Sequence, residues 1–206
     1  YASHMQAFDV QGPQTPARDT GDSDQRVFLH GLGWADYERL LEMRGESAGV
    51  RISYLEGEIE LMSPSRSHER LKTMIARLLE AYAEEKNVTL NGFGSWTIKS
   101  EPDERGAEPD ECYSLGPPGG APDLAIEVVW TGGGIDKLEV YRKLGVREVW
   151  IWQRERMSVH ALRDRRYEPV ERSELLPALD LDHLLTFVDT EDQTAAVRRY
   201  RAAVRG

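Results

Sequence analysis

The sequence predicts an α/β or α+β fold in which one central mixed β-sheet is flanked by helices. Segments with helical periodicity alternate along the chain with short apolar segments of strand type. The chain has 206 residues, which is enough for one substantial core and marginal for two. Over residues 121–150 an apolar strand, a glycine-rich turn, a short helix and a second apolar strand follow one another.

The start of the chain is expected to lie outside this fold. Residues 1–5 read YASHM, which is typical of a cloning scar. Residues 6–25 are rich in Gly, Pro, Asp, Thr and Gln and have almost no apolar periodicity. We therefore expect a scar and a disordered tail over residues 1–26 and a single domain over residues 27–206.

The first half of the domain is predicted to contain a short helix, a β-hairpin and a long helix, at residues 34–44, 50–62 and 63–86. The hairpin turn is placed at Glu56-Gly57, between two apolar segments. Ser63-Pro64-Ser65 supplies a capping serine and a proline for the first turn of the long helix. That helix carries one continuous apolar stripe, so one of its faces is expected to be buried.

The second half is predicted to be richer in strands. Its expected strands are residues 88–90, 93–99, 109–114, 124–129, 148–153, 157–162 and 167–170. Its expected helices are Lys137–Leu144 and residues 191–204, with a loop and a short helical turn over residues 175–185.

Composition limits the classes of function. The net charge of −10 argues against a dedicated non-specific nucleic-acid binder, although a local basic groove stays open. The chain has no apolar run long enough to span a bilayer, so we expect no membrane association. A single cysteine, Cys112, excludes a disulfide within the chain and is expected to be a buried small hydrophobe. This pattern suits a reducing cytoplasm, where we expect the protein to reside.

Glu127 is the first residue that needs a functional explanation. It lies in the middle of an apolar strand, where a carboxylate is costly unless it is paired, protonated or bound to a metal. Strand alternation places Glu127 on the face opposite the large apolar residues of that strand. If Asp110 opens the neighbouring strand, the two carboxylates meet at one end of the sheet. They would repel each other unless a proton or a cation lay between them.

Hard oxygen ligands without His or Cys favour Mg²⁺ or Mn²⁺ at such a site. Lys137, at the start of the following helix, is a candidate to orient a water or to stabilise developing negative charge. Structural interpretations stay open beside these. Asp110 can simply begin a strand, and Lys137 can be a solvated lysine. Asp136 is expected to cap the helix, and Asp123 to start its strand rather than bind a cation.

Four motifs in this order resemble the Uma-two family. They read GEIELMSPSRSHE at residues 57–69, EPDECY at 108–113, PDLAIEV at 122–128 and DKLEVYRKLGVREVWIW at 136–152. Uma-two proteins are restriction-endonuclease-like, a branch of the PD-(D/E)XK nuclease superfamily. The resemblance covers about residues 34–162. It implies a restriction-endonuclease-like core in which a sheet carries the Asp and Glu that bind a divalent cation.

By this resemblance, Asp110 matches the aspartate of the PD motif and Glu127 the acidic residue of the (D/E)XK strand. The lysine of that motif would fall at position 129, where this chain has Val129. The resemblance therefore points to Lys137 as the substitute lysine.

Two further residues are auxiliary candidates. Glu58, in the early hairpin, can be an extra acidic ligand or an exposed hairpin residue. His68, early in the long helix, can reach a phosphate or a water, or be a polar residue at the helix surface. Trp96, Trp130, Trp150 and Trp152 are expected in the core or at an interface rather than as base-stacking platforms.

The activity implied by the resemblance is Mg²⁺- or Mn²⁺-dependent hydrolysis of DNA phosphodiester bonds by an endonuclease. Asp110 and Glu127 would bind the cation, and Lys137 would position the water. The alternative is a catalytically inactive nuclease-fold protein that acts as a binding or assembly module. The missing lysine and the acidic charge favour that alternative. Because an acidic monomer of this size has little surface to grip a duplex, we also expect a homodimer.

Overall fold

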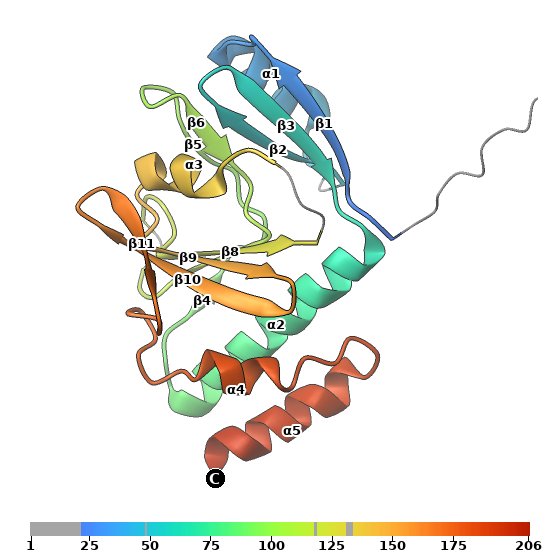
Figure 1. The fold of residues 1–206 in the computed structure, drawn as a ribbon, viewed down its shortest axis with the longest axis vertical. Helices are drawn as coiled ribbons and strands as arrows, with labels where there is room; N and C mark the ends of the chain where they lie inside the picture. Colours follow the sequence, from blue (N-terminus) through green and yellow to red (C-terminus); the bar gives the residue numbers. More distant parts are fainter. Residues whose placement is uncertain (1–21, 48, 118, 131–133) are drawn as a thin grey trace, which may run out of the picture.

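The structure is a computed structural model that describes residues 22–47, 49–117, 119–130 and 134–206 (Figure 1). The helices in these ranges are α1 (Trp34–Arg44), α2 (Arg66–Lys86), α3 (Lys137–Leu144), α4 (Leu181–Leu185) and α5 (Gln193–Arg205). The strands are β1 (Gln25–His30), β2 (Arg51–Leu55), β3 (Glu58–Ser63), β4 (Asn91–Gly92), β5 (Ile98–Ser100), β6 (Arg105–Ala107), β7 (Glu111–Ser114), β8 (Leu124–Val129), β9 (Glu148–Gln153), β10 (Arg156–Arg163) and β11 (Arg166–Val170).

The described strands form two sheets, whereas the sequence analysis expected one. The first sheet is antiparallel, in the order β1-β3-β2-β6-β5, and the second has the order β11-β10-β9-β8-β7-β4. In the second sheet β8 and β9 run parallel and their other neighbours are antiparallel, so this is the mixed sheet that was predicted. The α+β class is confirmed. Periodicity identifies strands but not their partners, which is why the separate antiparallel sheet was missed.

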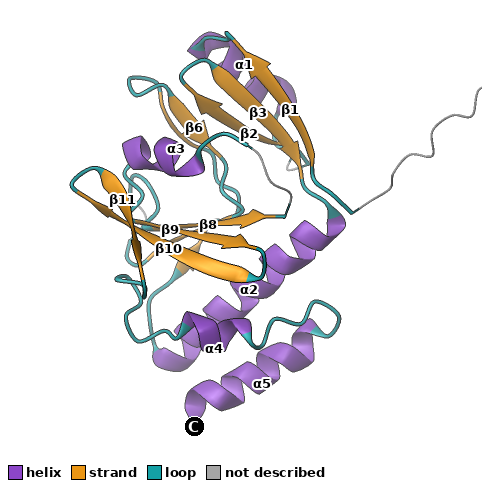
Figure 2. Ribbon diagram, viewed as in Figure 1, coloured by secondary structure: helices purple, strands orange, loops and turns teal. Residues whose placement is uncertain are grey.

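Helices cover both faces of the mixed sheet (Figure 2). α2 crosses one face, and its apolar stripe packs with β8, α4 and α5 in the largest core cluster. α3 lies on the other face, between the two sheets, where Val140 and Tyr141 are buried with Ala125 and Val149. The two faces of β8 therefore serve different cores, and Glu127 points to the side of α3, as strand alternation predicts.

Local signals explain several element boundaries. Glu56 and Gly57 have φ of 44° and 96°, the left-handed pair that a tight two-residue hairpin requires. Ser65 caps α2, and Asp136 caps α3 as expected, each through a side-chain oxygen that accepts a backbone N–H. The cysteine expectation is also confirmed: Cys112 is buried, and its burial raises the pKa of the thiol to about 12.

Three expectations about element bounds differ from the structure. No strand covers residues 88–90, since β4 consists of Asn91 and Gly92, the gap between the strands expected at 88–90 and 93–99. The strand expected over residues 93–99 is reduced to β5, because residues 93–97 form an irregular segment between β4 and β5. The tail expected over residues 1–26 overlaps β1, which begins at Gln25, and residues 1–21 of that tail lie outside the described residues. Among the described helices, none combines the length and apolarity needed to cross a bilayer.

Candidate active site

Asp110 and Glu127 are brought together by two neighbouring antiparallel strands of the mixed sheet. Glu127 is in the middle of β8, and Asp110 directly precedes β7, where Glu111 pairs with Ile126. The Asp110 carboxylate contacts the backbone of β8: its Oδ2 accepts the backbone N–H of Val128 at 2.6 Å. Both carboxylates are buried, with exposures of 1% for Asp110 and 5% for Glu127. The sheet therefore brings together the two acidic residues that the sequence singled out.

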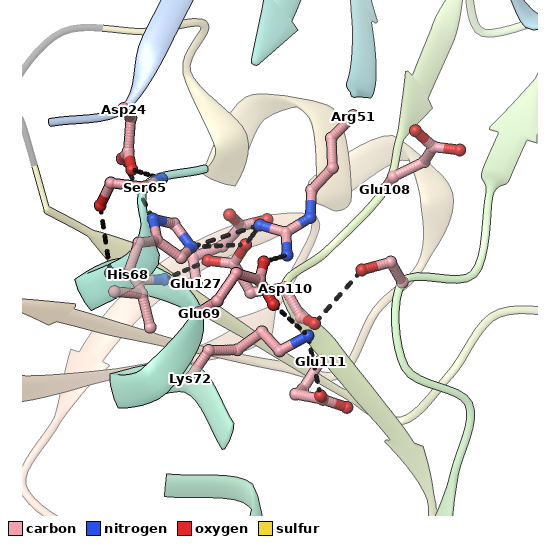
Figure 3. A network of polar contacts seen from close by, with 12 residues as sticks. Asp24, Arg51, Ser65, His68, Glu69, Lys72, Glu108, Asp110, Glu111 and Glu127 are labelled. Atoms are coloured by element: carbon pink, nitrogen blue, oxygen red, sulfur yellow. Dashed lines mark hydrogen bonds and ion pairs between the residues drawn. The ribbon is translucent and has the colours of Figure 1, made fainter. Parts of the chain in front are cut away.

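The other oxygen of Asp110 contacts two buried nitrogen groups (Figure 3). Oδ1 accepts a hydrogen bond from the Arg51 guanidinium, and it lies 3.0 Å from His68 Nε2. Arg51 also reaches outward to Glu69, with Nη2 2.5 Å from Oε1. Arg51 begins β2, whereas His68 and Glu69 belong to the first turns of α2. The Asp110 carboxylate thus joins both sheets and the long helix.

His68 lies between two carboxylates and has no exposed surface. Its Nδ1 is 3.0 Å from Oδ2 of Asp24, on the side opposite Asp110. Burial alone would raise the pKa of Asp24, but hydrogen bonds from His68 and from the backbone of Ser65 outweigh it. The pKa of Asp24 is therefore lowered from its ordinary 3.8, and the carboxylate stays ionised. The interpretation of His68 as a surface residue is wrong: its partner on the active-site side is Asp110.

Glu127 contacts two groups from α3. Its Oε1 accepts a hydrogen bond from the Tyr141 hydroxyl, and Lys137 Nζ lies 3.7 Å from the same oxygen. Lys137 also donates to Oγ of Ser53 at 2.7 Å, which fixes the ammonium against β2. Burial, and then the Glu127 charge, raise the pKa of Tyr141 well above 10, so this hydroxyl remains a donor.

Lys137 and Tyr141 are four residues apart, so both project from one face of α3. The buried Arg105 holds this helix in place: its Nη2 lies 2.8 Å from Glu56 and 3.3 Å from Glu139. Arg142 adds a second guanidinium to Glu139, with Nε donating to Oε2 at 2.8 Å. The position of the candidate lysine therefore depends on an ion-pair cluster on the far side of the helix.

Replacing Glu139 with glutamine is expected to reduce the acid sensitivity of folding. Hydrogen bonds from Arg142 and then Arg105 lower the pKa of Glu139 from 4.5 to about 2. Because the folded-state pKa is lowered, this stabilisation is complete above about pH 4.5 and is lost as the pH falls toward about 2. Urea unfolding should show Glu139→Gln less stable than wild type at neutral pH, with the gap narrowing in acid. A gap that does not change with pH would contradict this prediction.

The auxiliary candidate Glu58 lies apart from these contacts. It is at the hairpin end of β3, its side chain is 55% exposed, and its carboxylate is 3.3 Å from His30. The buried acidic residue of that strand is Glu60, whose Oε2 accepts the backbone N–H of Ile135 at 2.7 Å, just before α3. Both glutamates share one strand face, but only Glu60 is far enough from the turn to be covered by the loop that precedes α3.

Asp123 has the structural role that was expected. Its Oδ2 accepts the backbone N–H of Leu115 at 2.8 Å, at the start of β8 and away from Glu127.

Sequence reasoning missed Arg51, Ser53 and Tyr141. Arg51 and Ser53 are buried polar residues in an apolar hairpin strand. The argument applied to Glu127, that a charge in such a strand needs a partner, would have selected Arg51 as well. Tyr141 follows Lys137 by about one helical turn, and this spacing is the signal that could have placed it beside the lysine.

A family model described as "putative restriction endonuclease", Uma2, matches residues 34–191. The chain belongs to the Uma2 family. This confirms the resemblance to Uma-two proteins that the four motifs indicated. Among solved structures, this Uma2 chain is similar to one titled as a "putative nuclease belonging to DUF820" from Anabaena variabilis ATCC 29413.

That similarity has a TM-score of 0.50 at 14% identity, and it covers 71% of this chain and 90% of the other. At this identity it supports the fold. No curated protein matches the chain.

Restriction-endonuclease-like families generally use a divalent metal ion, and the donor atoms of this Uma2 chain are compatible with one. Within the described residues, no group of three or more His, Cys, Asp or Glu side chains is placed to hold a metal. A cation at this site would therefore have at most two protein ligands of these types in that part of the chain, and the buried carboxylates of Asp110 and Glu127 are the candidates. The contacts of Glu127 both fall on Oε1, and Oδ2 of Asp110 accepts the Val128 N–H. Mg²⁺ is often bound by one or two carboxylates, with water and phosphate completing its shell.

Proposed function

We propose that this Uma2 protein is a metal-dependent endonuclease that hydrolyses phosphodiester bonds in DNA. The observation that carries the proposal is the placement of Lys137 Nζ 3.7 Å from Glu127, on the strand beside Asp110. Two buried carboxylates and one lysine are the functional groups that metal-assisted phosphodiester hydrolysis needs. The lysine reaches the site from α3 instead of from position 129.

Each residue has a distinct proposed role. Asp110 and Glu127 would hold Mg²⁺ or Mn²⁺, which supplies polarisation of the phosphate and a lowered pKa of bound water. Lys137, fixed by Ser53, would orient the attacking water or neutralise charge that develops on the phosphate. Tyr141 orients Glu127 through its hydrogen bond, and His68 and Arg51 orient Asp110.

One observation favours a second function, a binding or assembly module without catalysis. The Arg51 guanidinium already supplies a positive charge to Oδ1 of Asp110, so the carboxylate is neutralised without a metal. Together with Val129 at the position of the family's lysine, this pairing is what an inactive relative would retain. Metal binding separates the two functions.

Calorimetric titration of Mg²⁺ and Mn²⁺ into the wild-type protein is the first test. We expect binding by wild type, at least a tenfold loss of affinity in Glu127→Gln, and cleavage of plasmid DNA that requires the cation. Glutamine keeps an oxygen for Tyr141 but removes the charge, so this variant should fold. Glu58→Gln is the matched control, since it removes an exposed glutamate of the same chain and should bind the metal like wild type.

Absence of metal binding by the wild-type protein would refute the metal-dependent mechanism and leave the non-catalytic module. Equal losses in Glu127→Gln and Glu58→Gln would mean that the cation binds elsewhere. The homodimer expected from the sequence stays a prediction, which sedimentation analysis can check.

A further inference from the structure

A cavity of about 860 Å³ opens beside the candidate active site. Arg51, which contacts Asp110, is part of its lining, as are Arg44, Phe93 and Trp96. Cavities of roughly 300–1,000 Å³ are typical of sites for small molecules and single nucleotides. Because Arg51 lines the cavity and also contacts Asp110, the cavity lies next to the carboxylate site.

The cavity carries two exposed aromatic rings. Phe93 and Trp96 are 36% and 40% exposed, and their ring centroids are 5.5 Å apart. The tryptophans were expected in the core or at an interface: Trp150 and Trp152 are in the core, whereas the exposure of Trp96 leaves only the interface alternative of that expectation. In the sequence between Phe93 and Trp96, Gly94 has a φ of +61°, a left-handed conformation that turns the chain sharply.

The segment with these rings is attached to the strand of Asp110. The backbone N–H of Phe93 donates to the carbonyl of Cys112 at 2.9 Å, and the Cys112 thiol donates to the carbonyl of Gly94 at 3.3 Å. Ser95 Oγ donates to the backbone carbonyl of Asp110 itself at 3.4 Å. The aromatic pair is therefore held in a fixed position relative to the candidate catalytic aspartate.

The charged groups of the cavity are balanced. Arg44 and Arg51 face Glu46 and Glu108 among its lining residues. Glu108 is satisfied internally, since it accepts hydrogen bonds from Thr97 Oγ1 at 2.6 Å and the backbone of Ile52 at 2.8 Å, and pairs with Arg44. The Nε atoms of Arg44 and Arg51 are buried without a hydrogen-bond partner in the described part of the chain. Arg44 pairs with Glu108, and Arg51 pairs with Asp110 and Glu69, so both arginines border the cavity as members of ion pairs.

We propose that this cavity binds unpaired nucleotides of single-stranded DNA, with bases against Phe93 and Trp96 and the backbone directed toward Arg51 and Asp110. This inference rests on the proposed endonuclease function and names the form of its substrate. Bases stack on aromatic side chains only when they are not paired within a duplex. Gripping a duplex requires many phosphate contacts, whereas the chain has a net charge of −10 and the cavity offers two arginines.

The test measures binding without hydrolysis. Fluorescence anisotropy of a labelled oligothymidylate of about ten nucleotides is recorded in EDTA, so that no cation supports cleavage. Trp96→Ala is expected to weaken binding about tenfold, in line with the loss of one stacked base, and Phe93→Ala somewhat less. Trp96→Phe, which keeps a ring, should retain most of the affinity. A duplex of the same length should bind more weakly than the single strand.

Trp130→Ala is the matched control, because Trp130 is 39% exposed but stacks on Trp152 outside this cavity. It should bind the oligonucleotide like wild type. Absence of binding by wild type, an unchanged affinity in Trp96→Ala, an equal loss in Trp130→Ala, or tighter binding of the duplex would each overturn the proposal.

The outcome is separable from that of the proposed function. Binding that depends on Trp96, without cleavage when Mg²⁺ or Mn²⁺ is added, would support the nucleotide cavity and refute the endonuclease. Cation-dependent cleavage with unaltered oligonucleotide binding by Trp96→Ala would do the reverse.

Discussion

Replacing Lys137 with methionine is expected to lower the rate of cation-dependent DNA cleavage by about 10²–10³-fold, the usual cost of removing one group that stabilises transition-state charge. Lys137 lies against Glu127 and is tethered by Ser53, so its ammonium is positioned in advance of the reaction. Methionine fills similar space without charge. Cleavage rates at saturating Mg²⁺ or Mn²⁺ measure the effect, and calorimetry should show that metal binding is retained.

The matched control is Lys143→Met, in the last turn of the same helix. The Lys143 side chain is 43% exposed, and its ion pair with Asp103 is a loose one, with Nζ 4.0 Å from Oδ1. Its loss should therefore leave the cleavage rate unchanged. Ser53→Ala separates position from charge: it keeps the lysine but removes its tether and should cause a smaller loss. If Lys137→Met cleaved DNA as fast as wild type, the lysine would have no part in the reaction.

The sequence predicted those parts of the fold that depend on local pattern. The stripe of α2, the Glu56-Gly57 turn and the parity of β8 follow from side-chain periodicity and turn chemistry within one segment. The separation of the strands into two sheets does not, since it depends on which edges meet in space.

The residues of the candidate site also fall into those that the sequence could predict and those that it could not. Glu127 could be identified because a carboxylate in an apolar strand is anomalous by itself, and Lys137 because it starts the next helix. Arg51 could have been selected by the same argument, but its pairing with Asp110 could not, because the two residues are 59 positions apart in the chain. Asp24, the other partner of His68, lies in a stretch whose composition resembles a tail. It contacts His68, Arg26 and the backbone N–H of Ser65, and contacts of this kind cannot be read from composition.

Replacing Arg51 with methionine is expected to destabilise the folded protein by about 3–5 kcal/mol, the cost of leaving a buried charge without its partner. Asp110 is 1% exposed, and without Arg51 its charge is offset only by His68 and the Val128 N–H among the contacts described above. Glu69 would also lose the guanidinium but is partly exposed, so water can replace that contact. Urea unfolding at neutral pH measures the change.

The control is Arg163→Met, since Arg163 pairs with Glu168 and Glu174 at the surface with a side chain 48% exposed. Exposed pairs contribute little, so this variant should lie within about 1 kcal/mol of wild type.

A double-mutant cycle with Asp110→Asn then tests whether the two buried residues stabilise one another. If they do, the double variant is destabilised by less than the sum of the single variants, because removing both charges leaves neither unpaired. Strict additivity would mean that Arg51 contributes by packing alone and does not serve as the counter-charge of Asp110. The observation that favours a non-catalytic module would then lose its physical basis, and only His68 and the Val128 N–H would remain as described partners of the Asp110 carboxylate.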